Sequence, residues 1–318
     1  MNPIHYFLEN QGFVILDGAM ATELERRGMD LNDPLWSAKC LYERPDLIRQ
    51  THLDYFLAGA DVATSASYQA SFKGFETKGF NEKVAQELFL KSVEIASEAR
   101  EIFWSDPLNR AGRLRPLVAA SVGPYGACLA DGSEYTGNYG VSDEQLKEFH
   151  WKRLEILSHS NADLLAFETI PCLQEAEVLV GLLKDFPQKT AWLSFSCKHG
   201  GQISSGEPFA KAVALANNSP QVVAVGVNCT SPQFIESLLK IAQNNTHKLL
   251  IAYPNSGEGW DAAHHCWADP ADGNWTSSAA AWYALGAKIL GGCCRTTPAD
   301  IARIRQSIAQ NSELSFQI

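Results

Sequence analysis

Lys288-Ile289-Leu290-Gly291-Gly292-Cys293-Cys294 is the pattern of a short apolar strand that ends at two glycines and two adjacent cysteines. On a straight strand neighbouring side chains face opposite ways, so the two sulfurs converge only where the strand ends and the backbone turns. A disulfide between adjacent cysteines would distort the peptide bond between them, whereas two thiolates are good ligands for a soft metal ion. The segment therefore predicts a metal site at the C-terminal end of a strand.

Seven more short segments rich in Val, Ile, Leu or Ala precede this one, and each is apolar on both faces, as strands of a parallel sheet are. They are Phe13 to Leu16, Ala60 to Ser65, Pro116 to Val122, Asp163 to Glu168, Ala191 to Cys197, Val222 to Asn228 and Leu249 to Tyr253. Helix-like segments alternate with them, namely Asp46 to Ala58, Asn81 to Ile102, Asp143 to Ser160, Leu173 to Leu183, Pro232 to Asn244 and Ser277 to Leu285. Eight strands with intervening helices in 318 residues predict an α/β fold, a (β/α)8 TIM-type barrel. No linker or composition break divides the chain, so we expect a single domain over residues 1–318.

The composition excludes several classes of partner. A net charge of −10 without a cluster of Lys or Arg argues against nucleic acid and against an anionic membrane surface. No apolar run is long enough to span a bilayer, and the N-terminal residues lack the pattern of a secretory signal. Eight cysteines at irregular spacing do not form a small disulfide framework, so we expect a reducing cytoplasm.

Polar residues gather at the C-terminal ends of the expected strands, where barrel enzymes build their sites. Cys229 follows the strand Val222 to Asn228, so it lies at the same end of the barrel as Cys293 and Cys294. Three thiolates with an open fourth position are typical of a catalytic zinc site. The alternative is that the three are small buried hydrophobic residues, as free cysteines often are. A rival cluster, His264-His265-Cys266, lies in a long polar loop without a second anchored ligand.

Two carboxylates end strands at the same rim. Glu168 closes an otherwise apolar strand and could hold a substrate ammonium, unless it forms a structural ion pair or caps a helix. Asp17 precedes Gly18-Ala19-Met20, where backbone N–H groups at a helix start would suit a substrate carboxylate, or where Asp17 itself serves as the cap. Thr64 and Tyr68, at the end of the next strand, are further candidate substrate-binding residues. Tyr68 could face the metal or pack as an ordinary rim aromatic. Other aromatic side chains that could surround a cationic methyl donor are Tyr125, Trp260, Trp267 and Trp275.

Several motifs combine these residues: Asp17-Gly18-Ala19-Met20-Ala21-Thr22-Glu23-Leu24, Ser121-Val122-Gly123-Pro124-Tyr125-Gly126-Ala127, Glu168-Thr169, Val227-Asn228-Cys229 and Gly291-Gly292-Cys293-Cys294-Arg295-Thr296. Together they resemble the zinc-dependent homocysteine S-methyltransferase family over nearly the whole chain. Two further motifs, Tyr253-Pro254-Asn255-Ser256-Gly257-Glu258 and Asp131-Gly132-Ser133-Glu134-Tyr135, look closest to the bacterial and plant members that use S-methylmethionine or S-adenosylmethionine.

The resemblance implies that Cys229, Cys293 and Cys294 bind one Zn²⁺, that Glu168 binds the homocysteine amine, and that Asp17-Gly18 lies at the amino-acid end of the substrate. Ser67 stands where betaine-using relatives have an aromatic before the tyrosine that matches Tyr68, which weakens a betaine-dependent alternative. The expected substrates are L-homocysteine and a sulfonium methyl donor.

The ligand chemistry favours the same reaction. Zinc with three thiolates is a feeble Lewis acid toward carbonyl groups but accepts a further thiolate, so homocysteine would bind through sulfur and no protein nucleophile is needed. A zinc-dependent barrel hydrolase would more often use imidazole and carboxylate ligands. A thiol-binding or metal-storage protein would not need the amino-acid pocket that Asp17 and Glu168 suggest.

Overall fold

Eight parallel strands form a closed barrel. The computed structural model describes residues 2–31, 33, 35–129, 131–257, 260–261, 266–267 and 275–315. The barrel strands are β1 (Val14–Ile15), β2 (Val62–Thr64), β3 (Leu117–Val122), β4 (Leu164–Ile170), β5 (Ala191–Phe195), β8 (Val222–Asn228), β9 (Leu249–Tyr253) and β12 (Ala287–Leu290). They pair in the order β1-β12-β9-β8-β5-β4-β3-β2, and a parallel bridge between Leu16 and Val62 joins the two ends of this series. The predicted (β/α)8 barrel is confirmed.

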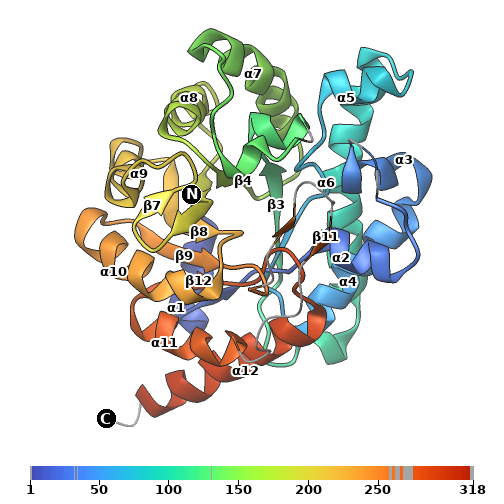
Figure 1. Cartoon of the computed structure of the whole chain (residues 1–318). Coiled ribbons are helices and arrows are strands. Elements are labelled where there is room, and N and C mark those ends of the chain that lie inside the picture. Colours follow the sequence, from blue (N-terminus) through green and yellow to red (C-terminus); the bar gives the residue numbers. More distant parts are fainter. Residues whose placement is uncertain are drawn as a thin grey trace.

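Helices surround the barrel (Figure 1). Those described are α1 (Ile4–Gln11), α2 (Met20–Arg26), α3 (Cys40–Glu43), α4 (Pro45–Ala58), α5 (Phe72–Thr77), α6 (Glu82–Ser105), α7 (Asp143–His159), α8 (Leu173–Leu183), α9 (Phe209–Leu215), α10 (Ile235–Asn245), α11 (Ala279–Ala284) and α12 (Pro298–Ser315). Local sequence fixes several starts: the Asn81 side chain caps α6, and Ser142 with Gln145 forms a capping box at α7. No described helix is long and apolar enough to cross a membrane.

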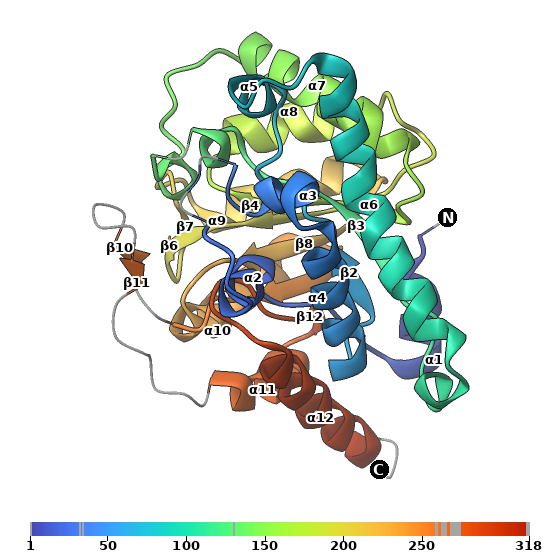
Figure 2. The same ribbon diagram turned by 90° about the vertical axis from the view of Figure 1, so that its right-hand side faces the viewer.

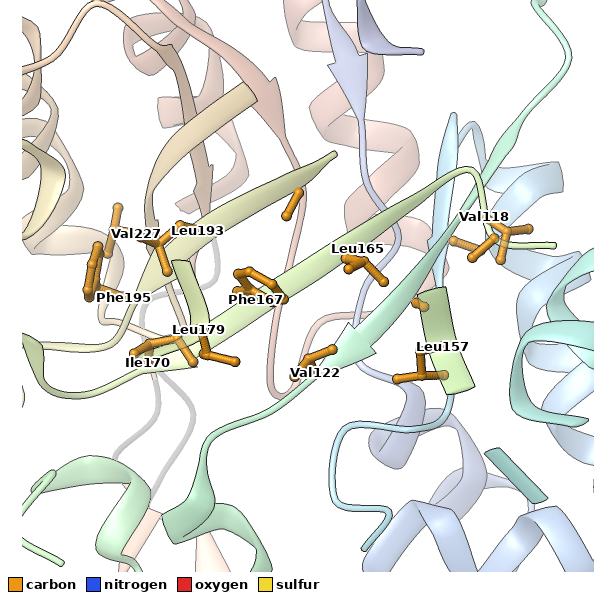
Figure 3. Packing of buried hydrophobic residues seen from close by; sticks show 14 of the residues in the cluster. Val118, Val122, Leu157, Leu165, Phe167, Ile170, Leu179, Leu193, Phe195 and Val227 are labelled. Atoms are coloured by element: carbon orange, nitrogen blue, oxygen red, sulfur yellow. The ribbon is translucent and has the colours of Figure 1, made fainter. Parts of the chain in front are cut away.

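Alternate residues of each strand face the barrel interior and the helices. In β4, Leu164 and Ala166 belong to the interior cluster, whereas Leu165 and Phe167 belong to the cluster between strands and helices. Figure 3 shows Leu165 and Phe167 in that outer cluster, which also holds Leu179 of α8. Burial on both faces explains why these strands are continuously apolar in sequence.

One end of the barrel is closed by the first helix. Ile4 and Phe7 of α1 are buried in the interior cluster beneath the strands. Figure 2 shows α1 on the opposite side of the barrel from the short pair β10 (Trp260–Asp261) and β11 (Cys266–Trp267). The hydrophobic plug leaves the other end, where the strands reach their carboxyl termini, for polar groups.

The structure corrects two strand boundaries. β4 continues past Glu168 to Ile170, with Thr169 in the left-handed region at φ 61°. β5 ends at Phe195, and Cys197 begins a separate hairpin of β6 (Cys197–His199) and β7 (Gln202–Ile203). Both sites combine apolar and polar residues at a strand end, where composition alone does not mark the turn.

The sequence predicts two longer loops at the open end, Ala127 to Val141 and Gly257 to Trp275. The first contains the end of the 3₁₀ turn η3 (Tyr125–Cys128) and the whole of η4 (Ser133–Tyr135). Most of residues 257–275 lies outside the described residues, and so do His264 and His265 of the rival metal cluster.

Candidate active site

The inward-facing positions become polar at the C-terminal ends of the strands. Counting two residues on from the interior positions Ala119, Ala166, Trp192 and Ile251 gives the inward-facing Ser121, Glu168, Ser194 and Tyr253. All four of these polar residues are at least 93% buried. The same strand periodicity that fills the barrel with apolar groups thus places a polar layer directly above them.

The three predicted cysteines meet at this layer. The sulfur atoms of Cys229, Cys293 and Cys294 all lie within 4.8 Å of one another, and the Sγ atoms of Cys229 and Cys294 are 3.4 Å apart. Hydrogen bonds with the other two thiols hold the pKa of the Cys229 thiol well below its usual value. The amide nitrogen Nδ2 of Asn228 lies 3.8 Å from the Cys293 sulfur. Among the described residues this is the one cluster of three potential ligands that could hold a metal ion.

Backbone geometry brings these sulfurs together. β9 separates β8 from β12, and the chain turns at both cysteine positions: Cys229 has a left-handed φ of 46° and donates its N–H to Tyr253 O at 3.2 Å. Cys293 donates its N–H to Pro254 O at 2.7 Å, and its own carbonyl accepts from the Thr296 hydroxyl at 2.6 Å. A side chain at Gly292 would come within 2.3 Å of that hydroxyl, so this turn requires glycine.

Glu168 lies beside the thiol cluster. Its Oε2 accepts a hydrogen bond from the Tyr253 hydroxyl at 3.1 Å, and its Oε1 accepts one from the Ser121 hydroxyl. Burial raises the pKa of this carboxyl to about 7, while the hydroxyl donors oppose that rise and the charge of Cys229 adds to it. The sequence left open a structural ion pair, but the described partners of Glu168 are hydroxyl groups.

The Asp17 carboxylate, just after β1, is held by a single neighbour, Thr64. Its Oδ2 accepts the Thr64 N–H at 2.8 Å and its Oδ1 accepts the Thr64 hydroxyl at 3.0 Å. Burial raises the pKa of Asp17 to about 8 despite these bonds. The α2 cap residue is Ala19, without a side-chain cap, so the helix-cap alternative for Asp17 is wrong. The Ala19 N–H donates to Thr296 Oγ1 at 3.2 Å, which ties this turn to the turn that carries Cys293 and Cys294.

A single cavity collects all ten residues predicted for the site. Its described lining includes Asp17, Gly18, Ala19, Met20, Thr64, Tyr68, Glu168, Cys229, Cys293 and Cys294. The lining also contains the carboxylates of Glu25 and Glu134, and none of its described members is Lys, Arg or His. An acidic, thiol-rich cavity suits cationic ligands and soft metals.

The sequence left several lining residues without a role. Trp36, Ser37, Glu134 and Tyr135 reach the cavity, and the Tyr135 hydroxyl lies 3.7 Å from the Cys229 sulfur. The motif that contains Glu134 and Tyr135 was visible, but nothing in it indicates contact with a cysteine 94 positions away.

Two of the four aromatic residues expected around a methyl donor, Tyr125 and Trp275, pack outside the described cavity lining. Tyr125 packs against Tyr139 and Phe149, with ring centroids 5.4 and 5.0 Å apart, and Trp275 stacks on Trp282. Neither Tyr125 nor Trp275 belongs to the described cavity lining. The side chains of Trp260 and Trp267 lie outside what the structure describes.

Comparison with known proteins agrees with this geometry. Residues 14–308 match the family described as homocysteine S-methyltransferase. The chain is 52% identical to homocysteine S-methyltransferase YbgG of Bacillus subtilis, with 96% of this chain and 97% of the relative covered. It is 46% identical to homocysteine S-methyltransferase 2 of Arabidopsis thaliana, with 97% of each covered.

A solved structure has the same fold. The metallated form of the homocysteine methyltransferase MmuM from Escherichia coli superposes with a TM-score of 0.86 at 46% identity, covering 96% of this chain and 99% of that one. With a family match over most of its length and close relatives in bacteria and plants, the chain belongs to the homocysteine S-methyltransferase family.

Proposed function

We propose that the chain transfers a methyl group from S-methylmethionine or S-adenosylmethionine to L-homocysteine, forming methionine, with one Zn²⁺ held by Cys229, Cys293 and Cys294. The observation that carries this proposal is the convergence of three thiols in an acidic cavity that also contains Glu168 and Asp17. Residues 1–318 would act as one homocysteine-binding domain.

The cysteines fit zinc in number and spacing. With zinc–sulfur bonds of about 2.3 Å in a tetrahedron, neighbouring sulfurs stand roughly 3.8 Å apart. The sulfur separations in the cluster, from 3.4 Å to within 4.8 Å, bracket that value without backbone rearrangement. Zinc bound there would supply one open position that could accept the homocysteine sulfur as a thiolate.

The chain's own residues would bind and orient the acceptor. Glu168 is placed to accept the homocysteine ammonium, because its carboxylate is buried beside the sulfur cluster. Asp17, Gly18, Ala19 and Met20 would lie at the amino-acid end. No hydrogen bond between described residues uses the N–H groups of Gly18 or Met20, so both remain free for a substrate carboxylate. Thr64 would keep Asp17 in place, and Tyr68 would form the cavity wall.

The transfer itself needs no protein nucleophile. The homocysteine sulfur forms a bond to the methyl carbon while the bond from that carbon to the donor sulfonium breaks, and the electron pair leaves with the donor as a neutral thioether. Alignment of the two sulfurs and exclusion of water lower the barrier, since water stabilises the separated charges of the reactants.

Two other functions are less well supported. A zinc-dependent hydrolase would benefit from a His or Asp base. No described lining residue is His, both oxygens of Asp17 accept hydrogen bonds from Thr64, and three thiolates leave zinc weakly electrophilic. Simple metal storage does not account for two buried carboxylates in the cavity. The seven cysteines whose side chains the structure describes are all free, which suits a reducing cytoplasm where the thiols stay available for metal.

The direct test is an assay of methionine formation by the zinc-loaded protein. L-homocysteine is supplied with S-methylmethionine, S-adenosylmethionine or betaine in parallel reactions. We expect methionine with at least one of the two sulfonium donors and none with betaine. Absence of methionine with both sulfonium donors would contradict the proposed function.

A further inference from the structure

The negative charge of the cavity suits the second proposed substrate, the methyl donor. The proposed donors carry two positive groups, a sulfonium and an α-ammonium, and the described lining offers no basic residue that would repel them. Of the lining carboxylates, Glu25 is exposed at the edge, whereas Asp17, Glu134 and Glu168 are buried or half-buried. Which of these three is available for the donor follows from their hydrogen bonds.

Asp17 and Glu168 already have hydrogen-bond donors, and Glu168 is also the proposed partner of the homocysteine ammonium. Both oxygens of Asp17 accept from Thr64, and the two oxygens of Glu168 accept from Ser121 and Tyr253. Glu134 differs, because its Oε2 is buried and has no hydrogen-bond partner among the described residues. A buried carboxylate oxygen without a donor is costly, and a bound N–H⁺ group would remove that cost.

The position of Glu134 suits a ligand that approaches the metal. It lies in the turn η4, and its neighbour Tyr135 places a hydroxyl 3.7 Å from the Cys229 sulfur. Glu134 thus lines the cavity from η4, beside the cysteines, whereas Glu168 lines it from β4. Glu168 is therefore available to a ligand on the β4 side of the cavity, and Glu134 is available to a ligand on the η4 side.

The turn that carries Glu134 has a fixed place. Glu175 of α8 is fully buried and accepts the Tyr125 N–H at 2.5 Å and the Tyr139 hydroxyl at 2.9 Å, one on each side of η4. The ring of His150 lies 2.8 Å from the same carboxylate. The Ser196 hydroxyl also donates to the Glu134 carbonyl at 3.3 Å. These bonds hold the turn in position, as a binding residue requires.

We propose that Glu134 binds the α-ammonium of the sulfonium amino-acid donor, an inference that rests on the proposed methyl transfer. The partner is the ammonium for a physical reason. The sulfonium charge disappears as the methyl group leaves, so a carboxylate held against the sulfonium would stabilise the reactants more than the transition state. The ammonium keeps its charge throughout, so binding it tightens the donor complex without opposing the chemistry.

The test compares two probes and two variants. S-methylmethionine is set against 4-(dimethylsulfonio)butanoate, which is the same molecule without its amino group. Glu134→Gln keeps the size of the side chain and removes its charge, and Glu177→Gln makes the same change at an exposed position on α8. Steady-state rates with homocysteine are measured for each zinc-loaded protein. Calorimetric binding of each probe without homocysteine gives the same comparison independently of turnover.

We expect Glu134→Gln to raise KM and Kd for S-methylmethionine about ten- to a hundredfold, the cost of one charge-assisted hydrogen bond, with kcat nearly unchanged. The deaminated probe should bind wild type and Glu134→Gln alike, and Glu177→Gln should match wild type throughout. Three results for Glu134→Gln would each overturn the assignment. They are unchanged affinity for S-methylmethionine, an equal loss of affinity for both probes, and a loss of affinity for homocysteine alone. If wild type forms no methionine but its donor binding still depends on Glu134, the methyl transfer fails and the binding site stands.

Discussion

Replacing Glu168 by Gln tests the acceptor side of the site most sharply. The carboxylate is 7% exposed, so solvent screens its charge little, and its hydroxyl partners Ser121 and Tyr253 can also bond to an amide. The change therefore removes mainly the charge offered to the homocysteine ammonium. A hydrogen bond to a charged group contributes about 1.5–3 kcal/mol, which corresponds to a loss of roughly 10- to 150-fold in homocysteine affinity.

Calorimetric titration of the zinc-loaded variant with L-homocysteine measures this loss, and elemental analysis checks that zinc is retained. Tyr253→Phe is the matched control, because it removes one donor to Glu168 and leaves the charge in place. We expect a smaller loss of affinity for that variant. Wild-type affinity in Glu168→Gln, with zinc retained, would show that the carboxylate has only a structural role.

Three other changes test the metal site, the barrel and the buried aspartate. Changing Cys229, Cys293 or Cys294 singly to Ala should abolish stoichiometric zinc binding and leave the circular dichroism spectrum unchanged. Cys128→Ala, outside the cavity lining, is the control and should keep the metal. Full zinc content in all three cluster variants would refute the ligand assignment. Gly226→Ala would place a methyl group 1.9 Å from Ile251 O and should lower the free energy of urea unfolding by about 3 kcal/mol or more. Gly181→Ala, with open space around it on α8, should raise the free energy of unfolding by up to about 1 kcal/mol. Equal stability of the two variants would contradict the packing. Burial raises the pKa of Asp17 from 3.8 to about 8, so the unfolded chain loses this proton at a lower pH than the folded protein does. The free energy of unfolding of wild type therefore falls as the pH rises from 3.8 to about 8. Asp17→Asn does not titrate, so its free energy of unfolding should rise by about 2–3 kcal/mol relative to that of wild type between pH 5 and 7. Parallel pH profiles of unfolding for the two proteins would count against a buried, protonated Asp17.

Much of the fold and the site could be predicted from the sequence because barrel strands are buried on both faces. Their apolar runs predicted eight strands, and the residues that follow parallel strands all lie at the same end of a barrel. The prediction that Cys229 lies near Cys293 follows from this rule. The strand ends themselves were less certain. Thr169 adopts a left-handed backbone inside β4, and nothing in its residue type requires that conformation.

The wall formed by η4 could not be predicted in the same way. Glu134 and Tyr135 belong to no periodic element, and their position depends on bonds from Tyr125 and Tyr139 to Glu175. Those contacts link residues 36 to 50 positions apart through a buried carboxylate on another helix. Local sequence carries the strand register, whereas tertiary hydrogen bonds decide where this turn lies.

The pairing of β1 with β12 also sets an order of events on the ribosome. Val14 leaves the ribosome early, yet its partner Ile289 is made about 275 residues later, roughly 15–50 s at ordinary rates of translation. Once β9 and Cys229 have been made, the edge of β9 that receives β12 stays unpaired, and Cys229 lacks Cys293 and Cys294, until the last strand is made. Synthesis of β12 and the residues directly after it completes both the hydrogen-bonded ring and the cluster of three cysteines. A nascent chain of this protein therefore depends, until its last strand emerges, on whatever shields open strand edges and keeps thiols reduced.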